Sequence, residues 1–297
     1  MPVSELIVQF PWLMPLVGGI FGLLLGSFIN VVVWRLPIMM ELAWRREAQA
    51  ASDSGIEIPA HIDADRFSLA YPASACPHCN APIRPWQNVP VVSYVLLGGR
   101  CGSCREPISL RYPIVEAGVG ILSAAVAWRF GFSWQCLAAL GMTWTLVAAS
   151  LIDADHYLLP DSLTLPLLWA GLLLAAFAPE SGAAFTDLRS AVFGAAAGYL
   201  SLWSVAKLFM LVTGKEGMGR GDFKLLGALG AWLGWQMLPL IITLSAAVGS
   251  ILGIAAITLL QRSRAKPLPF GPYLAISGWI ALMWGEDLIA LYLNVIL

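Results

Sequence analysis

Residues 12–34 read WLMPLVGGIFGLLLGSFINVVVW, a run without a single charged side chain. A transmembrane helix needs about 20 mostly apolar residues to cross a hydrocarbon core of about 30 Å. The run is too long for the apolar core of a signal peptide, and no small-residue cleavage site precedes the next polar segment. We therefore expect these residues to stay in the protein as a membrane-spanning helix.

The composition extends this expectation to the whole chain of 297 residues. Hydrophobic residues make up 59% and charged residues 12%, whereas about 25% of the residues of a soluble domain are charged. The mean hydropathy is +0.76. A soluble enzyme, a collagen-like or disordered chain and a secreted disulfide scaffold are excluded. The formal net charge of -1 gives no reason to expect a nucleic-acid partner.

Seven further apolar runs follow the first, and each can satisfy its backbone polar groups as a helix within lipid. They cover residues 113–130, 134–152, 162–178, 188–212, 223–235, 236–260 and 269–295. The run 223–235 is short for a span, and its glycines suit close helix packing as well as lipid. We predict an all-α polytopic membrane protein of about eight transmembrane helices, with membrane lipid around it.

The basic residues predict the orientation of the chain. Eight of the 17 lysines and arginines lie between the first two helices, and most others lie in two later loops, around Lys215 to Lys224 and Arg262 to Lys266. With eight spans these loops share one side, which the positive-inside rule makes cytoplasmic, leaving both termini outside. We expect a first helix in residues 1–34, a cytoplasmic insertion in 35–112 and a membrane-embedded core of about seven helices in 113–297.

The insertion contains two cysteine pairs, Cys76-Pro-His-Cys79 and Cys101-Gly-Ser-Cys104. Four thiolates in two such turns can surround one tetrahedral Zn²⁺, and a closed set of four leaves no open position for catalysis, so we expect structural zinc. Two disulfides or a redox site are the alternatives, which the reducing cytoplasm and the second copy of the motif disfavour. His78 is an alternative ligand.

Two aspartates stand at the expected inner ends of helices. Asp153 directly follows an unbroken apolar run, and Asp222 follows the turn Gly219-Arg220-Gly221. When two such carboxylates share a water, repulsion keeps one protonated while the other deprotonates the attacking water. The pair titrates as a unit, so neither role is assigned to one residue. The alternative is helix capping, which applies equally to Asp161, whereas Asp155 suits a solvated charge at the interface.

The residues 26–37, GSFINVVVWRLP, complete a set with the cysteine pairs, the Asp153 segment and Gly219-Arg220-Gly221-Asp222. In this order the motifs closely resemble the bacterial type IV prepilin peptidases, the leader peptidases of the GxGD aspartyl protease class. The resemblance covers nearly the whole chain; only residues 39–70 match no signature of that family.

The resemblance implies a bifunctional enzyme of the bacterial inner membrane, with Asp153 and Asp222 as its catalytic pair on the cytoplasmic side. Such enzymes remove the basic leader of type IV prepilins and type II secretion pseudopilins, and then N-methylate the new amino terminus with S-adenosylmethionine.

The methyl-transfer site rests on family analogy alone, because the chain has no Gly-x-Gly-x-x-Gly turn after a strand. We expect Gly98 and Gly99, beside Arg100, to contact that cofactor, and we also consider the inner end of the first helix around Asn30 and Arg35. Asn30 suits an interhelical hydrogen bond equally well. Glu116 is expected either to pair with Arg111 or Arg35 or to contact the substrate.

Three other functions remain open. The first is a peptidase without methyltransferase activity. The second is a transporter that uses Asp153 and Asp222 as a cation or proton site, and the third is a noncatalytic assembly subunit stabilised by zinc. A transporter predicts acidic residues near the middle of the membrane, whereas these two aspartates lie at helix ends.

Overall fold

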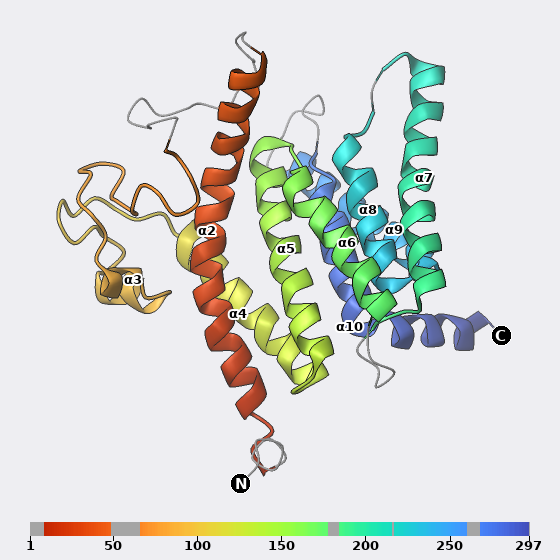
Figure 1. The fold of residues 1–297 in the computed structure, drawn as a ribbon, viewed down its shortest axis with the longest axis horizontal. Coiled ribbons are helices and arrows are strands. Elements are labelled where there is room, and N and C mark those ends of the chain that lie inside the picture. Colours follow the sequence, from red (N-terminus) through yellow and green to blue (C-terminus); the bar gives the residue numbers. More distant parts are fainter. Residues whose placement is uncertain (1–8, 49–65, 178–183, 216, 260–267, 297) are drawn as a thin grey trace. The chain divides into compact units, whose positions relative to one another are not determined.

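The computed structural model describes residues 9–48, 66–177, 184–215, 217–259 and 268–296. Within these ranges every regular element is a helix, apart from two isolated β-bridges, and Figure 1 shows the helices in chain order. The chain divides into two compact units, Met1–Phe132 and Ser133–Leu297. The predicted all-α class is confirmed.

The first unit is built on two long helices, α2 (Leu13–Ala48) and α4 (Arg111–Phe130), which pack along each other. Glycines of α2 make this packing close: a Cβ on Gly18 would lie 2.6 Å from the Cβ of Ala127, and one on Gly26 would lie 2.7 Å from the Cα of Glu116. Small residues allow such contact between membrane helices, whose association gains little from the hydrophobic effect.

Helix α2 runs well past Trp34, where the sequence predicted its end. It includes Pro37 and continues to Ala48, although proline inside a helix removes one backbone hydrogen bond. Tertiary packing explains the continuation, because Ile38 and Leu42, one turn apart, are buried in a cluster with Phe67. Residues from 35 onward, assigned to the insertion by sequence, therefore begin as an extension of the first helix.

Between residue 66 and the start of α4 the chain forms short elements only, namely the 3-10 helix η1 (Pro85–Asn88) and the helix α3 (Val92–Leu96). Two matching bridges, Ala75 to Pro82 and Arg100 to Pro107, close the two cysteine turns. The candidate metal ligands therefore lie on loops closed by backbone hydrogen bonds, such as those from the Cys76 N–H to the Ala81 oxygen and from the Cys101 N–H to the Glu106 oxygen.

The second unit contains α5 (Trp134–His156), α6 (Asp161–Phe177), α7 (Leu188–Thr213), α8 (Arg220–Leu233), η2 (Trp235–Met237), α9 (Leu238–Leu259) and α10 (Gly271–Ile296). Helix α8 is its centre: it packs against α6, α7 and α10, and lies between α6 and α7 in Figure 1. A Cβ on Gly198 of α7 would lie 2.6 Å from the Leu226 oxygen of α8, so these two helices touch through their backbones.

All eight predicted segments are helical, and six of the described helices are long and apolar enough to cross a membrane. Those six are α2, α4, α5, α7, α10 and the segment formed by η2 with α9. Helix α6 is apolar with 17 residues, and α8 has only 14 residues, most of them buried by protein. Helix α10 is kinked at Trp284, where φ is -139° and ψ is 15°; its last turns point away from the bundle in Figure 1.

Candidate functional site

Asp153 lies in the last turn of α5 and is almost fully buried, with 5% of its surface exposed. The helix closes just beyond it, because Tyr157 takes a left-handed conformation and donates its backbone N–H to the Asp153 carbonyl oxygen at 2.9 Å. The carboxylate itself accepts one hydrogen bond, from the backbone N–H of Gly271 to Oδ2 at 2.9 Å. The start of α10 therefore holds the Asp153 side chain.

Gly271 is a close-approach position. A Cβ at this residue would lie 2.7 Å from Asp153 Oδ2 and 3.1 Å from Leu159 Cδ1. Atoms this close cannot coexist without movement, so a glycine is needed for the helix start to reach the carboxylate. Sequence reasoning missed Gly271; the one signal was a Gly-Pro pair at the beginning of the last apolar run.

Asp222 lies in the first turn of α8 and is also buried, with 7% of its surface exposed. Its Oδ1 has no hydrogen-bond partner among the residues that the structure describes. A buried carboxylate oxygen without a partner is costly unless a ligand or water reaches it. The turn in front of Asp222 packs closely: a Cβ on Gly221 would lie 2.6 Å from the Leu159 Cβ.

Leu159 lies between the backbone segments that hold the two aspartates. Its side chain contacts Gly221, the neighbour of Asp222, and also Gly271, whose N–H binds Asp153. The structure therefore brings the two predicted aspartates into one site, formed by the ends of α5, α8 and α10. Both lie in terminal turns of their helices, which is not the mid-membrane position that the transporter alternative predicts.

Electrostatics couples the two carboxyl groups. Asp222 stands at the start of α8, which is not among the helices that qualify as spans. The pKa of Asp222 is raised to about 7, mainly by burial of the carboxyl group and secondly by the negative charge of Asp153. A pair in which one carboxyl is neutral and the other ionised at neutral pH has the acid and the base that peptide hydrolysis requires.

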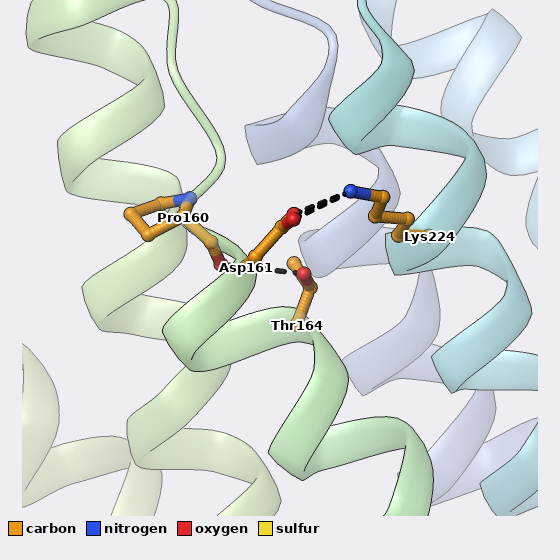
Figure 2. Close-up of polar contacts among 4 residues, drawn as sticks. All are labelled: Pro160, Asp161, Thr164 and Lys224. Carbon is orange, nitrogen blue, oxygen red and sulfur yellow. Dashed lines mark hydrogen bonds and ion pairs between the residues drawn. The ribbon is translucent and has the colours of Figure 1, made fainter. Parts of the chain in front are cut away.

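Asp161 and Lys224 form an ion pair beside this site. Figure 2 shows the two side chains pointing toward each other from α6 and α8, and Lys224 Nζ lies 2.6 and 2.7 Å from the two carboxylate oxygens of Asp161. The sequence offered Asp161 as a cap before a helix that starts at Ser162; instead Asp161 is the first residue of α6, and its carboxylate contacts a lysine. The pair ties the start of α6 to the turn of α8 that carries Asp222.

The four predicted metal ligands come together in the first unit. The Sγ atoms of Cys76, Cys79, Cys101 and Cys104 all lie within 4.8 Å of one another, and those of Cys76 and Cys104 are 3.8 Å apart. Tetrahedral zinc with bonds of about 2.3 Å requires sulfur atoms about 3.8 Å apart. All five cysteines are free thiols, so the disulfide alternative is wrong. His78 is exposed and is not part of the cluster.

The two cysteine turns are copies of each other. In the first, Asn80 donates its N–H to the Cys76 oxygen; in the second, Arg105 donates to the Cys101 oxygen, and both donors are left-handed, with φ of 54° and 63°. The backbone N–H groups of Cys104 and then Ser103 lower the pKa of the Cys101 thiol to about 6. This favours the thiolate, the form that binds metal, at Cys101, whereas burial and the neighbouring thiols raise the pKa of Cys104 to about 12.

Gly98 and Gly99 form the turn after α3. Both are left-handed, with φ of 61° and 68°, and the turn is held by a bond from the Gly99 N–H to the Tyr94 oxygen at 2.8 Å. A Cβ on Gly99 would strike the Tyr94 ring, whereas one on Gly98 would meet nothing within 4 Å. The left-handed backbone of the turn explains both glycines, and the space beside Gly98 is open.

The other candidate residues of the first unit serve packing between segments. Asn30 donates a hydrogen bond to the Tyr112 oxygen at 3.3 Å. Glu116 accepts the N–H of Val91 at 2.7 Å, so it meets a backbone group of the insertion. Arg35 donates to the oxygens of Ser68, Leu69 and Pro72 at 2.9, 3.3 and 2.6 Å; these carbonyls take the place of the expected carboxylate partner.

An apolar groove of about 870 Å³ lies between α5 and α6. The residues that line it include the small residues Ala138, Gly141 and Thr145 of α5, and Trp232 of α8. A Cβ on Gly141 would meet nothing within 4 Å. Neither Asp153 nor Asp222 is among the residues that line the groove.

Comparisons with known proteins agree with this geometry. Residues 20–130 match the bacterial peptidase A24 N-terminal domain, and residues 140–254 match the type IV leader peptidase family. A relative from Pseudomonas aeruginosa is 55% identical over 99% of this chain and 98% of its own length. The chain belongs to the type IV leader peptidase family.

Relatives from Aeromonas hydrophila and Neisseria gonorrhoeae are 50% and 47% identical, over 98% and 94% of this chain and 97% and 93% of their own lengths. All three relatives are named prepilin leader peptidase/N-methyltransferase. No solved structure matches the chain. The family agrees with the resemblance that the sequence motifs indicated, and the chain is a multi-pass membrane peptidase.

Proposed function

We propose that this protein cleaves the leader peptides of type IV prepilins and type II secretion pseudopilins with Asp153 and Asp222, and then N-methylates the new amino terminus. Relatives that match nearly the whole chain carry both activities in their name. One structural observation carries the peptidase half: two buried carboxyl groups from different helices meet around Leu159, and Asp222 Oδ1 has no partner among the described residues.

Hydrolysis follows from a water held between the two carboxyl groups. The ionised aspartate removes a proton from the water as its oxygen attacks the scissile carbonyl carbon, and the neutral aspartate donates a proton toward the carbonyl oxygen. When the tetrahedral intermediate breaks down, the C–N bond cleaves and the leaving amine takes a proton from the pair. The pair acts as a unit, so either residue fits either role.

The side of the membrane is part of the proposal. Lys224 follows Asp222 by two residues and Arg220 precedes it by two, and basic residues collect on the cytoplasmic side of membrane helices. We place the catalytic pair at the cytoplasmic face of the inner membrane. Of the basic residues used for the predicted orientation, Arg262, Arg264 and Lys266 lie outside the described residues.

Zinc has a structural part in this proposal. The sulfur spacing of Cys76, Cys79, Cys101 and Cys104 fits one tetrahedral Zn²⁺, which would join the two cysteine turns and fold the insertion. Because all four ligands come from the protein, the metal takes no part in bond breaking.

Methyl transfer requires S-adenosylmethionine, which supplies an activated methyl group. We propose that it binds beside Gly98 and Gly99, where the open space at Gly98 leaves the backbone accessible. The residues of the turn would then orient the cofactor toward the neutral form of the new amino terminus, whose lone pair is the nucleophile.

The decisive experiment compares aspartate variants of the purified protein acting on a prepilin in detergent. Asp153→Asn and Asp222→Asn should each lower the rate of leader removal about 1,000-fold, because each removes a group that transfers a proton. Asp155→Asn is the matched control, since Asp155 is exposed and lies two residues from Asp153 on the same helix end. Leader removal at the normal rate by both Asp153→Asn and Asp222→Asn would refute the peptidase mechanism.

A further inference from the structure

Helix α3 turns its apolar side away from the protein. Val92, Val95 and Leu96 share one helical face by their spacing and are 52%, 70% and 75% exposed, whereas Ser93 is buried. A short helix on a water-facing surface shows the opposite pattern, with polar residues outward. Val89 and Trp86, which precede α3 in the sequence, are apolar and also exposed. We call Trp86, Val89, Val92, Val95 and Leu96 the α3 patch.

The α3 patch begins beside a helix that is long and apolar enough to span the membrane. The N–H of Val91, directly before α3, binds the carboxylate of Glu116 at 2.7 Å. Glu116 is five residues into α4, which places it about 7.5 Å along the helix axis from Arg111. Figure 1 shows α3 level with the first half of α4. The start of α3 therefore lies beside the first two turns of α4.

The surroundings of the α3 patch match a lipid interface. Leu110, Ile114 and Ile121 of the neighbouring α4 segment are exposed apolar residues, as expected of a helix that faces lipid. Arg84 and Arg100 flank the patch in sequence, and both are exposed. Apolar residues between basic ones are typical of segments that lie in the headgroup region of an anionic leaflet.

We propose that the α3 patch is a membrane anchor that inserts into the leaflet beside the start of α4. The partner is the lipid surface itself: acyl chains contact Val92, Val95 and Leu96, and anionic headgroups contact Arg84 and Arg100. The buried Glu116 fixes the depth of insertion through its bond to the Val91 N–H. The anchor holds the Gly98–Gly99 turn, which directly follows α3, at the membrane surface.

Site-specific photocrosslinking of the full-length protein tests this anchor. Benzoylphenylalanine replaces Leu96 or Val95, and the protein is reconstituted in vesicles of phosphatidylethanolamine and phosphatidylglycerol with alkyne-tagged acyl chains. The matched control is the same substitution at Ser103, an exposed residue of the second cysteine turn. We expect about fivefold or more lipid adduct at positions 95 and 96 than at 103.

Equal labelling at position 103, no lipid adduct at 95 and 96, or adducts mainly to a second protein molecule would overturn the proposal. Elution of each labelled protein at the wild-type volume in size-exclusion chromatography establishes that it is folded. If benzoylphenylalanine at Val95 or Leu96 prevents folding, Val92 is the alternative position, and the same lipid adduct is expected there. Formation of the lipid adduct is measured independently of leader cleavage. A failure of the anchor proposal is therefore distinguishable from a failure of the proposed function.

Discussion

The backbone N–H of Gly271 donates a hydrogen bond to Asp153 Oδ2 at 2.9 Å, across 118 residues of sequence. This bond fixes one oxygen of the carboxylate and leaves the other for water or substrate. It also means that the first residue of α10 takes part in positioning Asp153, although its own side chain is a hydrogen atom.

Replacing Gly271 with alanine should therefore impair cleavage strongly. The new Cβ would lie 2.7 Å from Asp153 Oδ2, so either the carboxylate or the start of α10 must move. A displacement of about 1 Å in a catalytic group costs about 10- to 100-fold in kcat, and KM for prepilin should change little. Gly118→Ala is the control, because a Cβ there meets nothing within 4 Å; equal kcat values for the two variants would contradict the prediction.

The ion pair between Asp161 and Lys224 should affect activity more than stability. Its side chains are 56% and 28% exposed, and exposed pairs contribute about 0.2–1 kcal/mol to stability. Asp161→Asn and Lys224→Gln should each slow cleavage severalfold, because the first turn of α8 loses its tie to α6. A double-mutant cycle on the cleavage rate is the measurement. Additive effects of the two substitutions would show that the ion pair does not couple them.

Metal content should depend on the four clustered cysteines alone. The wild-type protein should contain one zinc ion per chain, and Cys76→Ser and Cys101→Ser should each lose it, because three thiolates do not close a tetrahedral structural site. Cys136→Ser should keep the metal, since Cys136 is buried in α5 and is not part of the cluster. Elemental analysis of the purified variants measures the zinc content. A normal zinc content in both Cys76→Ser and Cys101→Ser would refute the four-cysteine zinc site.

Substitution of Gly98 should separate the two activities. Gly98→Ala places a side chain in the open space proposed for the cofactor, so methylation should fall about 10-fold or more while leader removal continues. Gly214→Ala is the matched control, because Gly214 is also left-handed, with φ of 70°, and also has open space around its Cβ position. Mass spectrometry of the cleaved product measures the methyl group; full methylation by Gly98→Ala would exclude this location.

The sequence was sufficient for the helices and for the two clusters of reactive groups. Apolar runs predict helices because lipid requires each backbone polar group to be satisfied locally, and all eight runs are helical. The spacing of Cys76 to Cys79 and of Cys101 to Cys104 predicts the thiol cluster, and the helix-end positions of Asp153 and Asp222 predict a shared site.

Other features depend on tertiary contacts that no local pattern carries. The end of the apolar run at Trp34 predicted a helix end, and only the burial of Ile38 and Leu42 against Phe67 shows why α2 continues. Leu159 looked like any apolar residue, yet it contacts the glycines beside both aspartates. The pairing of Asp161 with Lys224 depends on α6 and α8 being neighbours, which hydropathy does not reveal.

The helix that carries Asp222 is short, and this bears on its relation to the bilayer. Helix α8 extends about 21 Å, less than a hydrocarbon core of about 30 Å, but most of its residues are buried by protein. Because neighbouring helices surround α8, its short length creates no hydrophobic mismatch that lipids would have to relieve by thinning. The thickness of the bilayer in which the protein is reconstituted should therefore have little effect on the position of Asp222.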